Sequence, residues 1–379
     1  MKICTITSHN VYNHGASLQA YALMKYLINC GHETVIINYR PDYLSKDYNF
    51  FSIDNPKWEK SIPARLFYIT LKFPGRLIAL KRKKAFDQFT EKYLILTDKE
   101  YKSNKELKNN PPIADAYICG SDQIWNSLHQ NGKDPAFYLD FVPPGKRRAS
   151  YAPSFATDFI DKELETFVYT QVKNLHLISV REKSGVELLK KLKIDSAVSV
   201  LDPVFLLGKN CWEELGNEKI PGEYILIYDF ENNHHIKKLA IDLAKETGLK
   251  IYTISTGMRN YGDKNFRFIG PLMFVSLIKN AKYVISNSYH AAVFSIIFRI
   301  PFAIFYRSES INTRMRDLLE ELNLSDRIVQ SSEQRSRDVF REPINFEYSE
   351  EIIQRWMNFS KTYINCALTM EAESFNLLE

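Results

Sequence analysis

The first forty or so residues constrain the fold more than any other part of the chain. Residues 3–7 form a short apolar run typical of a buried strand, and a polar loop containing Gly15 follows it. From residue 17 to residue 29 the apolar side chains recur at helical spacing, and residues 33–39 have the composition of a second strand. A strand, a helix and a second strand this close together form a βαβ unit, whose crossover predicts a parallel sheet.

The same alternation of strand and helix recurs along the rest of the chain. Further strands are expected at 116–119, 148–151, 177–180, 197–201, 224–228, 250–255, 267–269, 283–286 and 302–306. The series is interrupted near residues 207–221, so we predict an α/β protein with two Rossmann-like domains. An amphipathic helix at 350–368 is expected to pack back across them. The expected ranges are 1–207, with a helical insertion at about 58–95, then 208–345, and a C-terminal helical segment at 346–379.

Composition excludes several classes of protein. Of the 379 residues, 45% are hydrophobic and 25% are charged, which is close to the globular average and excludes global disorder. The five cysteines are scattered and form no C-x-x-C pair, so we expect neither a disulfide scaffold nor a bound metal. Without a signal peptide or an 18-residue apolar run, a cytoplasmic protein is expected. A net charge of +5 on this length is too weak to predict nucleic-acid binding.

Polar loops that follow the expected strands are the candidate binding segments, because ligands of parallel sheets bind at the carboxyl ends of the strands. The first such loop and the turn after it contain Asn13, His14, Gly15 and Ser17. Gly15 allows close approach of a ligand to the backbone. An ordinary turn in which Ser17 caps the helix is the alternative explanation.

The loop after the strand at 116–119 is the second candidate. It contains Ser121, Asp122, Trp125 and Asn126, and the indole of Trp125 is suited to stacking on a sugar. The alternative is that Ser121 and Asp122 cap a helix and that Trp125 belongs to the core.

Three further groups of cationic and hydroxyl residues suggest an anion site. Arg181 comes directly after a strand, where it needs either an anionic ligand or a salt bridge to a neighbour such as Glu182. His290 stands at a helix start in a Ser-rich turn suited to a phosphate or carboxylate, although a structural histidine is the alternative. The other members of these groups are Ser286, Ser288, Arg307 and Arg314.

Taken in order along the chain, these segments resemble the polysaccharide pyruvyl transferase family. The resemblance covers roughly residues 1–325, and its most specific parts are the GSDQIWN and SYH sequences. It rests on residues 13–23, 120–126, 179–182, 201–205, 286–290 with Phe294 and Ser295, and Asn312 with Arg314.

The resemblance implies a fold like that of GT-B glycosyltransferases, in which two Rossmann-like domains face each other across a cleft. It also implies that phosphoenolpyruvate donates a pyruvyl group to two hydroxyls of a sugar, forming a ketal in a bacterial capsule, exopolysaccharide or cell-wall polymer. Phosphoenolpyruvate is then a substrate bound on the C-terminal side, the acceptor binds on the N-terminal side, and no cofactor is expected.

This chemistry assigns a hypothetical role to each candidate residue. His290 supplies a proton or assists the leaving phosphate, while Arg181 and Arg314 hold the anion. Asp122 is the candidate base toward an acceptor hydroxyl. Asn13, Gly15 and Ser17 are expected to line the acceptor side or the space between the domains.

The basic, aromatic segment at 62–84 suggests contact with an anionic membrane, because acceptors in such pathways are often carried on polyprenyl diphosphate. The enzyme would then be peripheral at the inner face of the membrane. The alternative is an ordinary solvated helix face. Two rival functions remain open for the whole chain: a GT-B glycosyltransferase that uses a nucleotide sugar, and a sugar-binding relative without activity.

Overall fold

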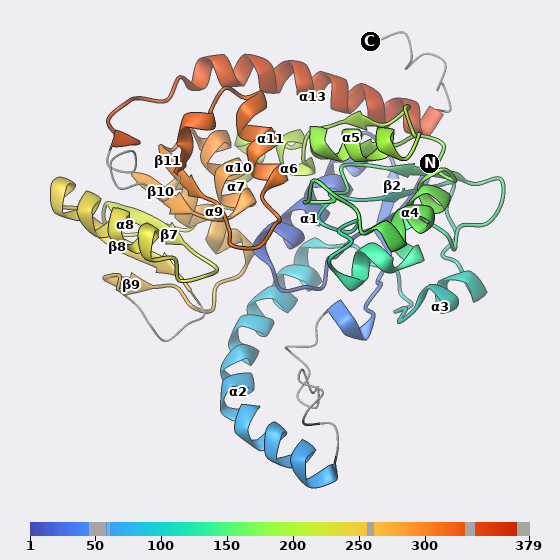
Figure 1. Cartoon of the computed structure of the whole chain (residues 1–379), viewed down its shortest axis with the longest axis horizontal. Coiled ribbons are helices and arrows are strands. Elements are labelled where there is room, and N and C mark those ends of the chain that lie inside the picture. Colours follow the sequence, from blue (N-terminus) through green and yellow to red (C-terminus); the bar gives the residue numbers. More distant parts are fainter. Residues whose placement is uncertain (45–57, 59–60, 256–260, 330–337, 370–379) are drawn as a thin grey trace.

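Two separate parallel sheets, each flanked by helices, form the frame of the molecule (Figure 1). The computed structural model describes residues 1–44, 58, 61–255, 261–329 and 338–369. Residues 59–60 of the expected helical insertion and 370–379 of the expected C-terminal segment lie outside these ranges. The sheets confirm the predicted α/β class.

The first sheet has four parallel strands in the order β2-β1-β3-β4. Their bounds are Lys2–Ile6 (β1), Glu33–Ile36 (β2), Ala116–Cys119 (β3) and Arg147–Ser150 (β4). The short strands β5 (Ser179–Val180) and β6 (Val198–Ser199) pair with each other beside β4. The strand order reverses between β1 and β3, so the loops that follow these two strands diverge at a topological switch point.

The second sheet has six parallel strands in the order β12-β11-β10-β7-β8-β9. Their bounds are Tyr224–Tyr228 (β7), Lys250–Ile254 (β8), Lys264–Asn265 (β9), Tyr283–Ser286 (β10), Phe302–Phe305 (β11) and Ile328–Val329 (β12). The strand expected at 267–269 is wrong, because the chain pairs with β8 at 264–265 instead. Here the order reverses between β7 and β10, which creates a second switch point.

Helices cover both sheets, and the first of them shows how the sequence sets an element. α1 (His14–Asn29) begins where the Asn13 side chain accepts a hydrogen bond from the Ala16 amide. The other helices are α2 (Ile62–Tyr93), α3 (Asn104–Asn109), α4 (Glu165–Val172), α5 (Lys183–Lys191), α6 (Pro203–Leu206), α7 (Gly208–Leu215), α8 (His234–Thr247), α9 (Pro271–Lys279), α10 (Tyr289–Phe298), α11 (Thr313–Glu321) and α13 (Phe346–Thr369).

The two halves of the molecule share buried apolar surface. One hydrophobic cluster contains Leu18 and Met24 of α1 together with Phe274 of α9 and Phe294 of α10. Because α1 belongs to the first sheet and α9 and α10 to the second, this cluster fixes how the two sheets face each other. Burial of this apolar area is the main stabilising term at the junction.

The C-terminal helix α13 runs across both halves, as expected from the sequence (Figure 1). The Ser349 hydroxyl near its start donates to the Leu322 carbonyl at 3.0 Å. Near its end the Tyr363 hydroxyl donates to the Ser150 carbonyl of β4 at 2.8 Å. In the described part of the chain, no helix has the length and apolar character needed to cross a membrane.

Candidate functional site

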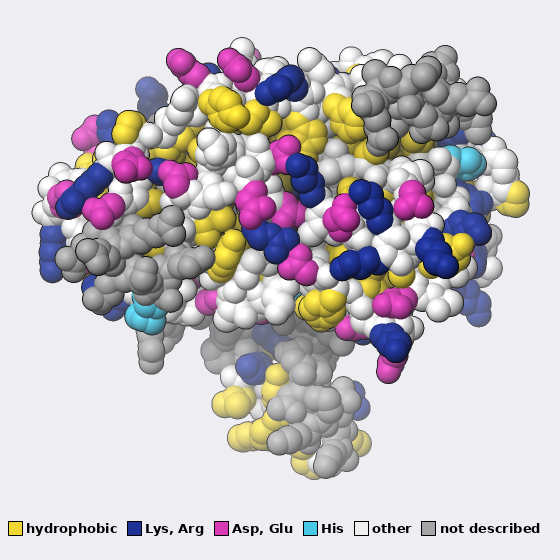
Figure 2. Space-filling model, turned by 45° about the horizontal axis from the view of Figure 1, so that its top comes forward, with side chains coloured by type: hydrophobic (Ala, Val, Ile, Leu, Met, Phe, Trp, Pro, Cys, Tyr) yellow, Lys and Arg dark blue, Asp and Glu magenta, His cyan; other side chains and the backbone are white. Residues whose placement is uncertain are grey.

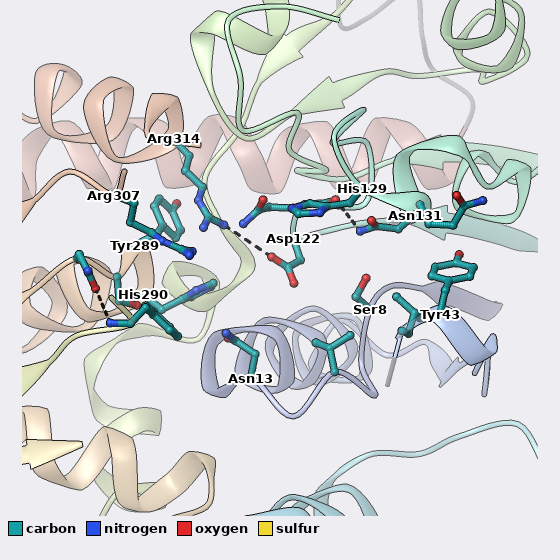
Figure 3. A pocket seen from close by; sticks show the side chains of 17 residues that line it. Ser8, Asn13, Tyr43, Asp122, His129, Asn131, Tyr289, His290, Arg307 and Arg314 are labelled. Carbon is teal, nitrogen blue, oxygen red and sulfur yellow. Dashed lines mark hydrogen bonds and ion pairs between the residues drawn. The ribbon is translucent and has the colours of Figure 1, made fainter. Parts of the chain in front are cut away.

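A pocket of about 380 Å³ lies where the two switch points face each other. The loops after β1, β3, β7 and β10 all reach it, and those after β1, β3 and β10 are the ones that the sequence singled out. Figure 3 shows His290, Asn13, Asp122 and Arg314 arranged around one space. The lining residues are Ser8, Val11, Asn13, Tyr43, Leu44, Asp122, Gln123, His129, Gln130, Asn131, Phe230, Asn287, Ser288, Tyr289, His290, Arg307 and Arg314.

His290 lies in the first turn of α10, directly after β10. The Ser288 hydroxyl accepts from the Ala291 amide and caps this helix. The imidazole is buried, and its Nε2 lies 3.5 Å from Oδ2 of Asp202. The ring also rests on α1, because a Cβ atom at Gly15 would lie 1.9 Å from His290 Nδ1. Gly15 therefore makes room for the histidine, and the structure gives it no place in the pocket lining.

Arg181 lies behind the pocket wall. Its Nη1 donates to Oδ2 of Asp202 at 2.7 Å, and its guanidinium lies 4.6 Å from the centre of the Tyr289 ring. The side chain is buried, and its Nε lies 4.0 Å from Oε2 of Glu182, so the salt bridge considered as the alternative is present. Nε and Nη2 nevertheless have no hydrogen-bond partner among the described residues. A buried guanidinium normally has its donors paired, so this arginine retains capacity for a further acceptor.

Arg314 is the second buried cation, and it lines the pocket itself. The Gln123 amide orientation that satisfies both groups places its oxygen 2.7 Å from Nη2 and 2.9 Å from Nη1 of Arg314. The guanidinium also lies over the Tyr289 ring at 5.5 Å. Burial, reinforced by the charge of Arg181, lowers the pKa of Arg314 to about 10. The two arginines therefore repel each other, and an anion between or beside them would relieve this repulsion.

Asp122 projects into the pocket from the loop after β3 (Figure 3). Its Oδ1 lies 3.8 Å from Nη1 of Arg314. The residue has a φ of 69°, a left-handed backbone conformation that favours Gly, Asn or Asp. No helix begins at Asp122, so the alternative in which this residue only caps a helix does not hold.

Arg307, which also lines the pocket, already forms ion pairs with two glutamates. Its Nε lies 3.3 Å from Glu231 and its Nη2 lies 2.9 Å from Glu309. It lines the pocket as predicted, together with Asn13 and Ser288.

His14 packs between the two halves of the molecule and does not line the pocket. Its ring stacks on Phe274 at 4.9 Å, and its Nδ1 lies 3.0 Å from the Tyr228 hydroxyl. Burial holds the pKa of His14 well below its ordinary value, so the ring is neutral at neutral pH. A structural role at the junction of the sheets follows.

Five other predicted residues are also buried away from the pocket. The Ser121 hydroxyl donates to the Ala152 carbonyl, and the Ser286 hydroxyl donates to the Tyr228 carbonyl. Asn126 accepts from the Leu128 amide. These three residues therefore use their polar groups within the fold. Ser17 lies inside α1, which Asn13 caps, so the alternative in which Ser17 caps this helix is wrong. These five residues are Ser17, Ser121, Trp125, Asn126 and Ser286.

Trp125 is the clearest case, because its indole has no exposed face for a sugar. The ring is fully buried, stacks on Tyr138 at 5.3 Å and donates its Nε1–H to the Phe137 carbonyl. We expect Trp125→Ala to lower the free energy of unfolding by about 3–5 kcal/mol, since it removes a large buried side chain. Urea unfolding measures this loss, and the milder Trp125→Phe variant should lose less. A Trp125→Ala protein as stable as the wild type would contradict the core position.

Asp202 contacts two of the candidate site residues, Arg181 and His290, although the sequence assigned it no role. Its Oδ1 caps α6 by accepting from the Val204 amide, while its Oδ2 faces both Arg181 and His290. Burial alone would raise the pKa of Asp202, but its interactions with His290 and Arg181 outweigh burial and hold the pKa well below its ordinary value. The sequence signals were the Asp-Pro pair at 202–203, which also marks an ordinary helix cap, and the place of Asp202 within residues 201–205, one of the segments that carry the family resemblance.

Comparison with known proteins gives a family and a fold. The family model described as polysaccharide pyruvyl transferase matches residues 13–309. A search of the curated proteins finds no match.

Solved structures of similar shape include three described as UDP-N-acetylglucosamine 2-epimerases. The protein from Listeria monocytogenes has a TM-score of 0.57 at 10% identity, covering 98% of this chain and 97% of its own. The protein from Rickettsia bellii has a TM-score of 0.52 at 12% identity, covering 100% and 98%. The protein from Neisseria meningitidis, bound to UDP-GlcNAc, has a TM-score of 0.51 at 10% identity, covering 98% and 100%. At this identity the likeness shows the fold alone, which is the GT-B arrangement of two Rossmann-like domains across a cleft.

Proposed function

The chain belongs to the polysaccharide pyruvyl transferase family, and from this premise we propose that it transfers the pyruvyl group of phosphoenolpyruvate to two hydroxyls of a sugar. One observation carries the proposal: two buried arginines, Arg181 and Arg314, flank Tyr289 beside His290 at the end of β10. Both guanidinium groups keep nitrogen atoms without a hydrogen-bond partner among the described residues, and a small ligand with both a carboxylate and a phosphate supplies acceptors for such donors.

The donor is proposed to bind at the second switch point. The first turn of α10 presents backbone amides, the Ser288 hydroxyl lies at the same point, and Arg314 contributes bidentate donors. The free donors of Arg181 support the same assignment, because an anion that approaches them would complete their hydrogen bonds.

The proposed reaction uses the polar and charged groups around this position. His290 donates a proton to the methylene carbon of phosphoenolpyruvate, which leaves an oxocarbenium-like centre. One sugar hydroxyl attacks this centre as Asp122 accepts its proton; phosphate departs, and a second hydroxyl closes the ketal. The sum is one phosphoenolpyruvate and one sugar diol giving one pyruvate ketal and one inorganic phosphate.

The acceptor is proposed to occupy the side of the pocket formed by the first sheet. Tyr43, Asn131 and Asn13 line this side (Figure 3). The hydroxyl of Tyr43 is fixed by donating to Asp134 at 2.5 Å, so its ring is held in place for contact with a sugar. A bacterial surface polysaccharide or its polyprenyl-diphosphate-linked precursor is the acceptor we propose.

Donor dependence tests this function. The purified chain is incubated with phosphoenolpyruvate or with UDP-sugars, each with a panel of lipid-linked and nucleotide-linked glycans, and the products are weighed by mass spectrometry. We expect one glycan to gain the mass of one pyruvate less one water, with release of one equivalent of phosphate. Transfer from a UDP-sugar alone would establish the rival glycosyltransferase function instead.

A further inference from the structure

Helix α2 extends away from the rest of the molecule as an arm (Figure 1). A set of apolar side chains along it has no described partner to bury them fully, and Figure 2 shows hydrophobic side chains at the surface of this arm. Ile62 is 73% exposed, Leu66 is 61% exposed and Phe73 is 47% exposed. Several large apolar side chains exposed to water on one short segment usually mark an interaction surface.

These side chains form a single line on the helix. The apolar stripe consists of Ile62, Leu66, Ile69, Phe73, Leu77 and Leu80. Its members are separated by three or four residues, so with 3.6 residues per turn they share one face of α2. Two further exposed apolar residues, Phe67 (59%) and Leu71 (63%), lie outside the stripe, and Phe67 stacks on Trp58 at 5.8 Å. The stripe is the longest apolar row on the helix, and such a row can enter an apolar layer.

The charges beside the stripe are of one sign. Residues 62–86 contain seven Lys and Arg and no Asp or Glu. Arg65, Lys72, Lys81 and Lys84 are exposed, and within the described part of the chain none of the four has a salt-bridge partner. By helical spacing, Arg65 and Lys72 fall on one flank of the stripe and Lys81 falls on the other. This combination complements an apolar layer bordered by anionic groups.

The inner half of the arm contacts the wall of the pocket. Arg82 donates to the Tyr12 carbonyl at 2.9 Å, and the ring of Phe86 lies 6.1 Å from that of Tyr12. Tyr12 stands between Val11 and Asn13, which both line the pocket. The part of α2 that follows the stripe therefore lies against the acceptor side of the site.

We propose that α2 docks the protein on a lipid bilayer containing anionic lipids. The apolar stripe enters the boundary between headgroups and acyl chains, and the flanking Lys and Arg contact lipid phosphates. The docking rests on α2 alone, whereas its purpose, which is to bring the pocket to a lipid-carried acceptor, rests on the proposed function. The apolar stripe could instead bind the same stripe of a second copy of the chain. The basic flanks disfavour such a dimer, because two such flanks repel each other.

Vesicle sedimentation of the full-length protein tests the docking without any substrate. We expect the protein to pellet with vesicles of phosphatidylcholine and phosphatidylglycerol, to pellet less with phosphatidylcholine alone, and to be released by added salt. The double variant Leu66→Ser/Leu77→Ser should partition at least about tenfold more weakly, because it removes two apolar groups from the inserted face. Lys72→Glu/Lys84→Glu should weaken binding at low salt and have little effect at high salt.

Two matched variants and one further readout sharpen the result. Ile113 is 82% exposed outside the arm, so Ile113→Ser should bind vesicles as the wild type does, and Lys105→Glu should do the same. Melting curves show whether each variant is folded.

Absence of binding to anionic vesicles at low salt, or equal binding by the stripe variants, would overturn the proposal. A stripe variant that turns a dimer into a monomer, with no vesicle binding by the wild type, would assign the stripe to a second copy. Either result leaves the transfer assay unaffected.

Discussion

Replacing His290 with glutamine should lower kcat for pyruvyl transfer by about 10²–10⁴-fold, the range that a positioned general acid or base contributes. Glutamine keeps polar atoms near the position of the ring but cannot take up and release a proton near neutral pH. The KM for phosphoenolpyruvate should change little, because Arg314 and the α10 amides remain. Acceptor-dependent release of phosphate, measured at saturating phosphoenolpyruvate, gives both constants.

The comparison variant is His234→Gln, which makes the same change on the exposed start of α8, away from the pocket. It should transfer at the wild-type rate. Melting curves must show that the His290→Gln protein is folded, since its ring packs against Gly15. A folded His290→Gln enzyme with undiminished transfer would remove the central role proposed for this residue.

The arrangement of the sheets was largely predictable, because long apolar runs bounded by polar loops leave few alternatives. The bounds of β3, β7 and β10 were predicted correctly, and all three strands are buried almost throughout. Shorter edge elements were less predictable. β9 has two residues and forms few ladder hydrogen bonds. The local sequence preference of so short a strand does not determine its position.

The position of the pocket was also predictable, whereas the direction of individual side chains was not. The strand-end rule located His290, Arg314 and Asp122 correctly at the pocket. It did not distinguish them from Trp125, because the residues of an irregular loop follow no fixed period and only the packed structure shows which side chains face the core. The sequence did not predict a role for Asp202, because its partner His290 is distant in the sequence and the two meet only in the folded chain.

Replacing Asp202 with asparagine should damage both stability and transfer. The variant leaves Arg181 buried without its carboxylate, which should cost about 3–5 kcal/mol of unfolding free energy. It also removes the anion that lies 3.5 Å from His290 Nε2 and orients the ring, so we expect kcat to fall by about 10²-fold.

Because the pKa of Asp202 is held well below its ordinary value, the carboxylate stabilises the fold at every pH above the ordinary aspartate range. That stability is lost progressively as the pH falls from the ordinary aspartate range toward the depressed folded-state value. Urea unfolding and transfer kinetics, each measured across pH, report the two effects.

The matched variant is Asp158→Asn, which also breaks an arginine pair but does so at the surface. Asp158 receives two hydrogen bonds from Arg316, far from His290 in the pocket, and its side chain is 59% exposed. It should lose no more than about 1 kcal/mol and keep the wild-type rate. If Asp202 only supported the fold, Asp202→Asn would lower stability while the pH dependence of kcat stayed that of the wild type. A changed pH profile in the folded variant is the result that places Asp202 in the positioning of His290, because only a residue coupled to the proton donor alters how its action depends on pH.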